Sequence, residues 1–122
     1  MKHLLDTMLQ DCSGPDEFVF TIRCGECGST WSSRPARFSK AGIAPPSEGK
    51  RVVYDALYQK EKAEARQDAL RQAVERFNIC PICGRAVCNH CFMICEDLDM
   101  CVTCARKLDE EGTPVVPPRS DG

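Results

Sequence analysis

Large aromatic side chains are scarce in this chain. Its 122 residues include five Phe, two Tyr and one Trp, which is little material for a hydrophobic core. Small chains with so little core material are usually stabilised by disulfide bonds or metal ions. The length predicts one domain, or one small domain with an inserted element.

Long hydrophobic runs are also missing. No stretch approaches the ~20 apolar residues of a membrane span. Near the N-terminus, Leu4 and Leu5 are followed at once by Asp6, and no small-residue cleavage site comes after them, so no secretory signal is predicted. We therefore expect a cytoplasmic protein with reduced thiols, in which Cys-x-x-Cys pairs are more often metal ligands than disulfides.

Net basic charge and catalytic groups are lacking as well. The formal net charge is −2, whereas nucleic-acid-binding proteins usually carry a net basic face. The chain has two His, and no Ser/His/acid set is suggested. A redox Cys-x-x-Cys would need a thioredoxin-like strand–helix setting that this sequence does not show. The sequence therefore predicts no enzymatic activity.

What the chain has in abundance is cysteine. Of ten cysteines, eight form four Cys-x-x-Cys pairs. The pairs are Cys24/Cys27, Cys80/Cys83, Cys88/Cys91 and Cys101/Cys104. Two intervening residues let both sulfurs face one ion, and a Gly after the second Cys, as at Gly28 and Gly84, permits the close turn of a zinc knuckle. We predict that these eight cysteines bind two structural Zn²⁺ ions, although tetrahedral thiolate sites also suit iron.

The order of the pairs leaves their grouping open. A sequential arrangement joins the first two pairs and the last two, whereas an interleaved one joins the first with the third and the second with the fourth. Four residues separate Cys83 from Cys88, enough for a tight hairpin whose two pairs face different ions. Three further candidates are left out of the metal set. They are Cys12, expected to be a small buried side chain, Cys95, and His90, expected to donate a hydrogen bond beside a site or lie at the surface.

Residues 80–104 resemble the core of FYVE-type cross-brace zinc fingers, which belong with the PHD and RING cross-braces and the treble-clef fingers. The stretch has Cys-x-x-Cys-Gly, three further residues, Cys-x-x-Cys and a closing Cys-x-x-Cys before a predicted short helix, and residues 24–31 look like the first knuckle. The resemblance implies interleaving. One ion would bind Cys24, Cys27, Cys88 and Cys91, and the other Cys80, Cys83, Cys101 and Cys104. The basic run with which FYVE domains bind phosphoinositides is absent around Cys80, so lipid binding is not implied. The first two knuckles also resemble rubredoxin-like ribbons, which would group sequentially.

The predicted fold is a small, zinc-stabilised α+β domain whose zinc knuckles carry short β-hairpins. Its predicted segments are an N-terminal helix (1–13), a first knuckle and hairpin (17–33), a loop (34–48), a long helix insertion (49–78), a C-terminal zinc-finger core (79–108) and a disordered tail (109–122). The long helix is favoured because neither Gly nor Pro follows Gly49 in that stretch. Its ends, around Val53 and Leu70, are apolar and expected to pack. Its middle is polar nearly all round and is expected to face solvent or a partner.

These features predict a non-enzymatic, zinc-binding protein-interaction or adaptor module that binds another protein through the long helix or the knuckle face, without a membrane partner. The alternative is a nucleic-acid-associated zinc-ribbon regulator. Its basic cluster would be Arg34, Arg37, Lys40, Lys50 and Arg51, beside Trp31 and Phe38. A ubiquitin-ligase-like function ranks third because it rests on the cross-brace analogy alone.

Overall fold

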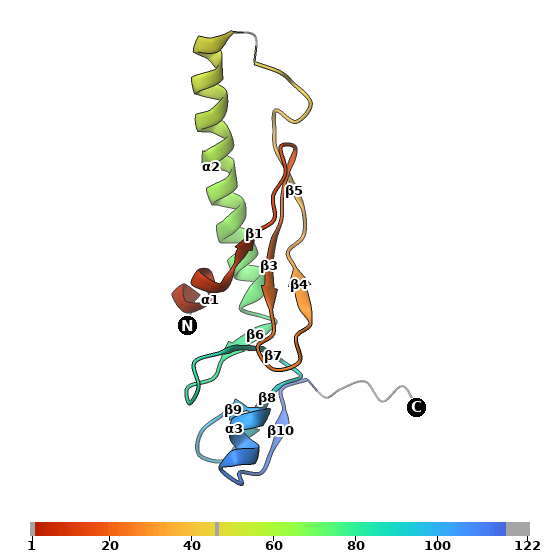
Figure 1. Cartoon of the computed structure of the whole chain (residues 1–122), viewed down its shortest axis with the longest axis vertical. Helices are drawn as coiled ribbons and strands as arrows, with labels where there is room; N and C mark the ends of the chain where they lie inside the picture. Colours follow the sequence, from red (N-terminus) through yellow and green to blue (C-terminus); the bar gives the residue numbers. More distant parts are fainter. Residues whose placement is uncertain (1, 46, 117–122) are drawn as a thin grey trace, which may run out of the picture.

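A computed structural model describes residues 2–45 and 47–116. The molecule is elongated, with the longest helix running along the N-terminal strands and the cysteine-rich C-terminal third at one end (Figure 1). The helices are α1 (Lys2–Met8), α2 (Glu48–Ala73) and α3 (Val102–Lys107). The strands are β1 (Gln10–Asp11), β2 (Glu17–Phe18), β3 (Phe20–Arg23), β4 (Thr30–Ser32), β5 (Ala36–Arg37), β6 (Phe77–Ile79), β7 (Ala86–Cys88), β8 (Phe92–Cys95), β9 (Met100–Cys101) and β10 (Gly112–Pro114). No helix in these ranges is long and apolar enough to cross a bilayer.

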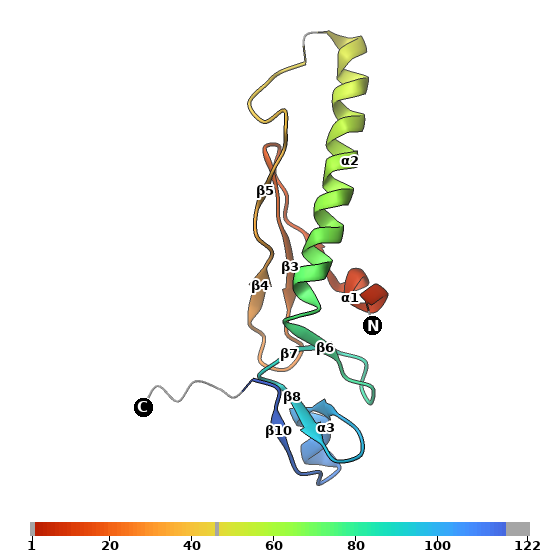
Figure 2. The ribbon, with the colours of Figure 1, turned by 180° about the vertical axis from the view of Figure 1, so that it is seen from behind.

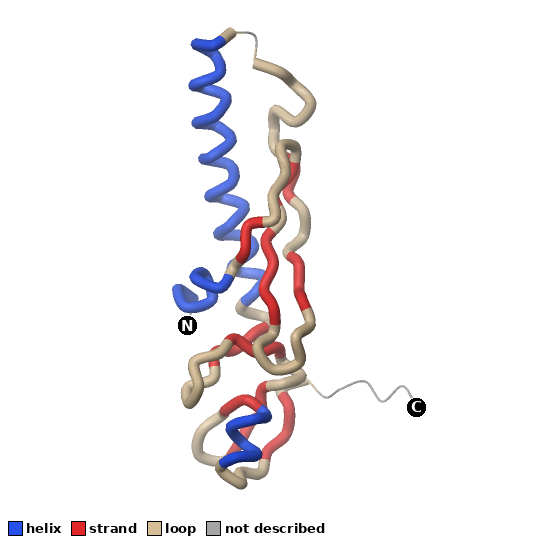
Figure 3. Tube along the Cα trace, viewed as in Figure 1, coloured by secondary structure: helices blue, strands red, loops and turns tan. Residues whose placement is uncertain are grey.

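The strands form four small antiparallel sheets, which Figure 3 shows as separate red segments along the trace. Their strand orders are β1-β3-β4, β2-β5, β6-β7 and β10-β8-β9. A cysteine turn joins β3 to β4, with Ile22 opposite Trp31, and a second cysteine turn joins β6 to β7, with Asn78 opposite Val87. The two hairpins therefore share one design, in which a strand leads into a knuckle and a strand returns from it.

The few aromatic side chains are concentrated between the N-terminal strands and α2. Phe18, Phe20 and Phe38 are fully buried. The Phe38 ring makes edge contacts with Tyr54 and Tyr58 of α2, at centroid distances of 5.4 and 5.2 Å. Such pairs stabilise by about 0.5–1.5 kcal/mol beyond their buried area. This cluster holds α2 against the strands, and Figure 2 shows the helix beside β3 and β5 from behind.

The polar middle of α2 packs on the chain's own N-terminal segment. The Arg66 guanidinium pairs with Asp6 at 2.8 Å, Lys62 pairs with Asp11, and the Tyr58 hydroxyl donates to the carbonyl oxygen of Gly14 at 2.9 Å. The prediction that this middle faces solvent or a partner is therefore wrong for one side of the helix. Long basic side chains cover apolar surface with their stems while their charged ends find partners.

The first turns of α2 pack only in part as predicted, because Tyr54 and Leu57 pack against the core while the two valines before them stay exposed. Ser47 caps the helix by accepting a hydrogen bond from the Lys50 N–H at 3.2 Å. Beyond this cap, Val52 and Val53 are 71% and 63% exposed. The apolar start of the helix therefore presents part of its surface outward.

Three predicted boundaries are corrected by strand pairing. The long helix, predicted over 49–78, ends at Ala73 because Phe77–Ile79 pairs with β7 across the second knuckle. The predicted helix over 1–13 ends at Met8 because β1 pairs with β3, and the predicted loop over 34–48 contains β5, which pairs with β2. Cys12, expected to be buried, is exposed, with its Sγ 3.5 Å from the Thr21 hydroxyl.

The predicted disorder over 109–122 is wrong for its described part. Strand β10 pairs with β8, and the main-chain N–H groups of Val115 and Val116 donate to Phe92 and Asn89 at 2.9 and 3.1 Å. Gly112 allows this close pairing, since a Cβ there would lie 2.5 Å from the Ile94 carbonyl oxygen. Residues 117–122 lie outside the described residues.

Candidate metal centres

The structure brings the eight predicted cysteines together in two groups of four. Site 1 contains Cys24, Cys27, Cys88 and Cys91, and site 2 contains Cys80, Cys83, Cys101 and Cys104. The four sulfur atoms of each group lie within 4.8 Å of one another. The grouping is interleaved, as the cross-brace resemblance implied, and not sequential.

The separations between sulfur atoms suit a tetrahedral ion. With a Zn–S bond of about 2.3 Å, neighbouring sulfurs of a tetrahedron lie about 3.8 Å apart. In site 1 the Cys27–Cys88 and Cys88–Cys91 sulfur distances are 3.9 and 3.6 Å. In site 2 the Cys80–Cys104 and Cys83–Cys101 distances are both 3.8 Å. A disulfide needs about 2.05 Å, and all ten cysteines are free. Each group could therefore hold one metal ion.

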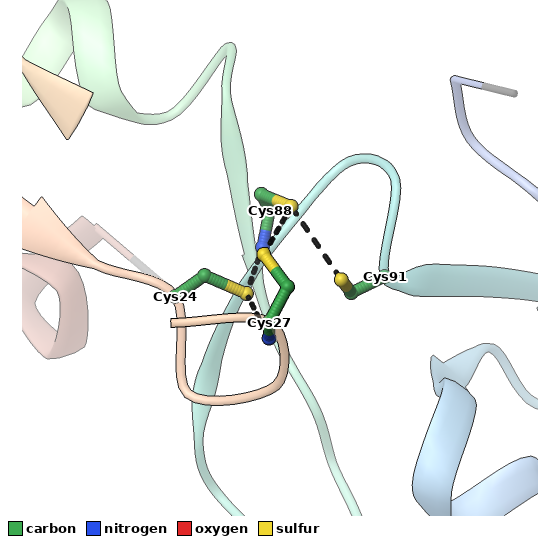
Figure 4. A group of neighbouring side chains, drawn as sticks. All are labelled: Cys24, Cys27, Cys88 and Cys91. Carbon is green, nitrogen blue, oxygen red and sulfur yellow. Dashed lines mark hydrogen bonds between the residues drawn. The ribbon is translucent and has the colours of Figure 1, made fainter. Parts of the chain in front are cut away.

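Site 1 joins the turn between β3 and β4 to the turn between β7 and β8 (Figure 4). The Cys24 sulfur accepts hydrogen bonds from the main-chain N–H groups of Glu26 and Cys27 at 3.4 Å and of Cys88 at 3.3 Å. Gly28 has φ +76°, a left-handed conformation that glycine adopts without strain, and its N–H returns to the Cys24 carbonyl at 3.0 Å. The knuckle predicted from the sequence thus aims amide N–H groups at the Cys24 sulfur.

Site 2 repeats the knuckle and adds a helix. Gly84 also has φ +76°, and its N–H donates to the Cys80 carbonyl at 2.8 Å. The Cys80 sulfur accepts the main-chain N–H of Cys101 at 3.4 Å. Cys101 precedes α3 and Cys104 lies in its first turn, where the partial positive charge of a helix start favours thiolates.

The thiols of each group differ in acidity. A hydrogen bond with the Ser29 hydroxyl lowers the pKa of Cys27 to about 6. Burial raises the pKa of Cys83, but hydrogen bonds from Arg85 outweigh it and lower that pKa to about 6. Burial raises the pKa of Cys104 to about 12 and also raises that of Cys91. Four thiolates at these distances repel one another, so full deprotonation of either group requires a cation. A set of four sulfur donors suits zinc or iron.

Arg85 connects the two sites, although it was not among the site residues predicted from the sequence. Its guanidinium donates to the sulfurs of Cys83 and Cys101 in site 2, at 3.4 and 3.6 Å. The same group donates to the Gly25 carbonyl and, at 2.7 Å, to the Glu26 carboxylate in the site 1 knuckle. The only signal in the sequence is a basic residue directly after the Cys-x-x-Cys-Gly turn.

Two further contacts strengthen this connection. The Thr103 hydroxyl of α3 donates to the Glu26 carboxylate. The Gly25 N–H donates to the Ala86 carbonyl at 2.8 Å. The turn of site 1 is therefore fastened to both ligand segments of site 2.

The other residues singled out from the sequence lie apart from the metal groups. His90 is exposed, with Nδ1 2.9 Å from the Val116 carbonyl oxygen, and Cys95 belongs to neither group. The predicted basic cluster is split along the length of α2, and Lys40 and Lys50 line one cavity at its start. Arg34 bonds to Gln72 near the end of α2, whereas Lys50 lies in its first turn, about 30 Å away at ~1.5 Å per residue. Phe38, its expected aromatic companion, is fully buried.

Comparisons with models of known protein families, with curated proteins and with solved structures find no match to this chain. The cross-brace resemblance therefore rests on the spacing and grouping of the cysteines.

Proposed function

We propose that this chain is a non-enzymatic protein-interaction module held together by two structural Zn²⁺ ions in a cross-brace, treble-clef-like arrangement. The observation that carries the proposal is the pair of four-sulfur groups at tetrahedral spacing, each drawn from two separate segments. Four thiolates complete the coordination of zinc and leave no position for a water or a substrate, which catalytic zinc requires. The metal ions would then fix the positions of the segments that carry the binding surfaces.

One candidate binding surface is the distal arm, which we define as residues 40–45 together with residues 48–57 of α2. The arm projects away from the metal sites (Figures 1 and 2). Ile43, Val52 and Val53 are 57%, 71% and 63% exposed there. A cavity of about 250 Å³ lies between the loop and the helix. Exposed apolar surface of this kind on a small chain favours contact with a partner protein.

The metal part of the proposal is tested by native mass spectrometry with metal analysis. We expect two zinc ions per chain, and loss of far-ultraviolet circular dichroism when a chelator removes them, because zinc binding and folding are coupled in such sites. Retention of fewer than two ions, or an unchanged fold after chelation, would contradict it.

The interaction part is tested on the distal arm. The double variant Val52→Asp/Val53→Asp should reduce quantitative affinity capture of partner proteins at least tenfold relative to wild type. The matched control is Gln67→Asp, at an exposed position of α2 outside the arm. Equal capture by wild type and the double variant would exclude the arm as the binding surface.

A further inference from the structure

A groove lies between β4 and the C-terminal end of α2. It consists of two adjoining cavities of about 270 and 240 Å³, which share Trp31 of β4 and Arg76. One cavity continues toward His90 beside site 1, and the other toward Arg34. We call this feature the β4 groove.

The main chain of β4 offers unpaired hydrogen-bonding groups to this groove. The main-chain hydrogen bonds between β4 and β3 fall at every second residue. The Cys24 N–H donates to the Ser29 carbonyl and the Ser33 N–H donates to the Phe20 carbonyl, at 2.8 Å each. In an antiparallel ladder the N–H and C=O groups of Thr30 and Ser32 then point away from β3. Within residues 2–45 and 47–116, β4 pairs with β3 alone. A free strand edge is a ready template for another extended chain.

Arg34, just past the end of β4, connects this edge to α2. Its main-chain N–H donates to the Gln72 side chain of α2 at 2.9 Å. Thr30, Ser32 and Arg34 all line the two cavities, so the edge of β4 borders the groove. Gln72 closes the edge at one end and leaves Thr30 and Ser32 available.

The groove is basic although the chain as a whole is acidic. Arg34 and Arg76 are exposed, and neither pairs with a carboxylate among the described residues. His90 also lines the groove, and Glu75 is the one acidic residue that lines the two cavities. The Trp31 ring is half-buried against Phe77, at a centroid distance of 6.1 Å, and leaves part of its surface open. Charge complementarity favours an acidic occupant with apolar side chains between its charges.

We propose that the β4 groove binds an acidic peptide segment in extended conformation. The peptide pairs with the main chain of Thr30 and Ser32, and its carboxylates contact Arg34 and Arg76. This inference rests on the proposed function, because it names the partner class of the interaction module. A peptide is favoured over a nucleic-acid strand because it alone supplies the alternating N–H and C=O groups that the edge can pair.

The groove also depends on site 1. Ser29 and Thr30 line one cavity and directly follow the first knuckle, which supplies Cys24 and Cys27. Cys88 and His90 line the same cavity and belong to the segment that supplies Cys88 and Cys91. Peptide affinity is therefore expected to be lost when the metal ion of site 1 is removed, since its ligands position β4 and the end of the groove near His90.

The test is selection from a displayed random heptapeptide library on the zinc-loaded protein. We expect enrichment of sequences with Asp or Glu separated by β-branched or aromatic residues. A synthetic enriched peptide should bind at least tenfold more weakly to Arg34→Glu/Arg76→Glu. N-methylation of alternate peptide amides should weaken it similarly, because those amides pair with β4. The matched control, Arg106→Glu/Lys107→Glu, reverses two exposed charges of α3, outside both the β4 groove and the distal arm, and should leave affinity unchanged.

Enrichment of peptides without acidic residues, absence of any enrichment, or unchanged affinity in Arg34→Glu/Arg76→Glu would overturn this inference. Circular dichroism and metal content verify that each variant is folded. Peptides that lose affinity only in Val52→Asp/Val53→Asp would place binding on the distal arm, so the interaction module would stand and the β4 groove proposal would fail. Tighter binding of oligo-dT than of any selected peptide, lost in Arg34→Glu/Arg76→Glu, would overturn the peptide in favour of nucleic acid. Failure of the metal analysis, by contrast, would count against the proposed function itself.

Discussion

Site 2 is built from one short stretch of chain, whereas site 1 joins distant parts. Cys83 and Cys101 of site 2 are 18 residues apart, and Cys27 and Cys88 of site 1 are 61 apart. Because loop-closure entropy grows with the logarithm of loop length, the longer loop costs only about 1 kcal/mol more to close. Distance along the chain is thus a small thermodynamic penalty for site 1. It has a large structural consequence, because β4, β5 and all of α2 lie within that loop.

The two sites therefore have different tasks. Site 2 organises the C-terminal strands and α3 from within, and its local contacts should form early in folding. Site 1 fastens the β3–β4 hairpin, and with it the aromatic cluster under α2, to that C-terminal part. Interleaving makes the second knuckle hairpin the common support, since its strand β7 ends on Cys88 of site 1 while its turn supplies Cys80 and Cys83 of site 2.

The largest expected effect comes from two quadruple Cys→Ser variants, which differ in whether they damage one site or both. Replacing Cys24, Cys27, Cys88 and Cys91 removes only site 1, so one zinc ion per chain should remain. Replacing Cys24, Cys27, Cys80 and Cys83 damages both sites, so none should remain. Structural zinc sites contribute on the order of 10 kcal/mol to folding, so the second variant should be unfolded and the first should keep a folded C-terminal part. Native mass spectrometry and circular dichroism measure both outcomes.

The same two variants decide between the groupings. Sequential pairing would reverse the result, with no ion retained by the first variant and one ion by the second. Cys12→Ser/Cys95→Ser is the matched control, because these thiols belong to neither group, and it should retain two ions.

Replacing Arg85 tests how far the two sites depend on each other. Arg85→Ala removes hydrogen bonds to two site 2 sulfurs and to the site 1 knuckle. Loss of such supporting contacts usually weakens metal affinity about 10- to 100-fold, and we expect the loss at both sites. Competition titration with a zinc-binding dye measures both affinities.

Two controls accompany this variant. Arg85→Lys keeps the charge but cannot reach several acceptors at once, so it should recover only part of the affinity. Arg106→Ala removes an exposed basic residue of α3 and should change neither affinity. A loss confined to site 2 would mean that Arg85 supports its own site without coupling it to the other.

The cysteines of the two candidate metal centres were predictable from the sequence because knuckle geometry is local. Cys-x-x-Cys followed by Gly specifies a turn that needs no information from elsewhere, and both Gly28 and Gly84 have the left-handed conformation that this reading required. The grouping of the pairs was not predictable from spacing alone, because it depends on where two hairpins meet. The resemblance to cross-brace fingers was needed to favour the interleaved alternative.

Other features escaped prediction because they depend on partners far away in the chain. Phe77–Ile79 follows a strong helix-forming stretch, and only its pairing with β7 makes it a strand. Arg66 lies in the polar middle of the helix, which was expected to face solvent or a partner, yet its guanidinium donates to the Asp6 carboxylate, 60 residues away. Composition could show that the middle of α2 is polar but not that polar contacts hold it to its own chain. The β4 groove arises in the same way, from segments that the sequence keeps apart.

The knuckle glycines allow a smaller, matched test of the two sites. Ala at a left-handed position costs about 1–2 kcal/mol, so Gly28→Ala and Gly84→Ala should each lower the free energy of unfolding by this amount. A Cβ at Gly84 meets nothing within 4 Å, and one at Gly28 meets the mobile end of Arg23 at 3.2 Å, so backbone strain dominates in both. Urea unfolding at fixed zinc concentration measures the effect. The control Gly49→Ala, inside α2, should stabilise by about 0.5–1 kcal/mol, and a neutral Gly28→Ala would contradict the account of site 1.

The smallest expected effect concerns the ion pair between Asp11 and Lys62, which attaches the N-terminal segment to α2 without a metal ion. Burial raises the pKa of Asp11, but hydrogen bonds with Lys62 and Ser13 outweigh it and hold that pKa below 3.8. Because the folded pKa is depressed, the stabilisation is present above the unfolded pKa and is lost only as pH falls through the folded pKa. Asp11→Asn should therefore cost less than about 1 kcal/mol, since both side chains are partly exposed, and the cost should stay constant from about pH 5 to 8.

Zinc retention behaves differently over the same range, because protons compete with the metal for the thiolates and retention falls as pH falls. Unfolding of wild type and Asp11→Asn, measured with metal content at several pH values, separates the two contributions. Asp97→Asn, an exposed carboxylate in the turn after β8, is the control and should have no effect. If the cost of Asp11→Asn instead followed zinc loss, the ion pair with Lys62 would exist only while site 1 holds the hairpin in place. The N-terminal segment would then be held to α2 by its remaining contacts, the Asp6–Arg66 ion pair and the hydrogen bond from the Tyr58 hydroxyl to the Gly14 carbonyl.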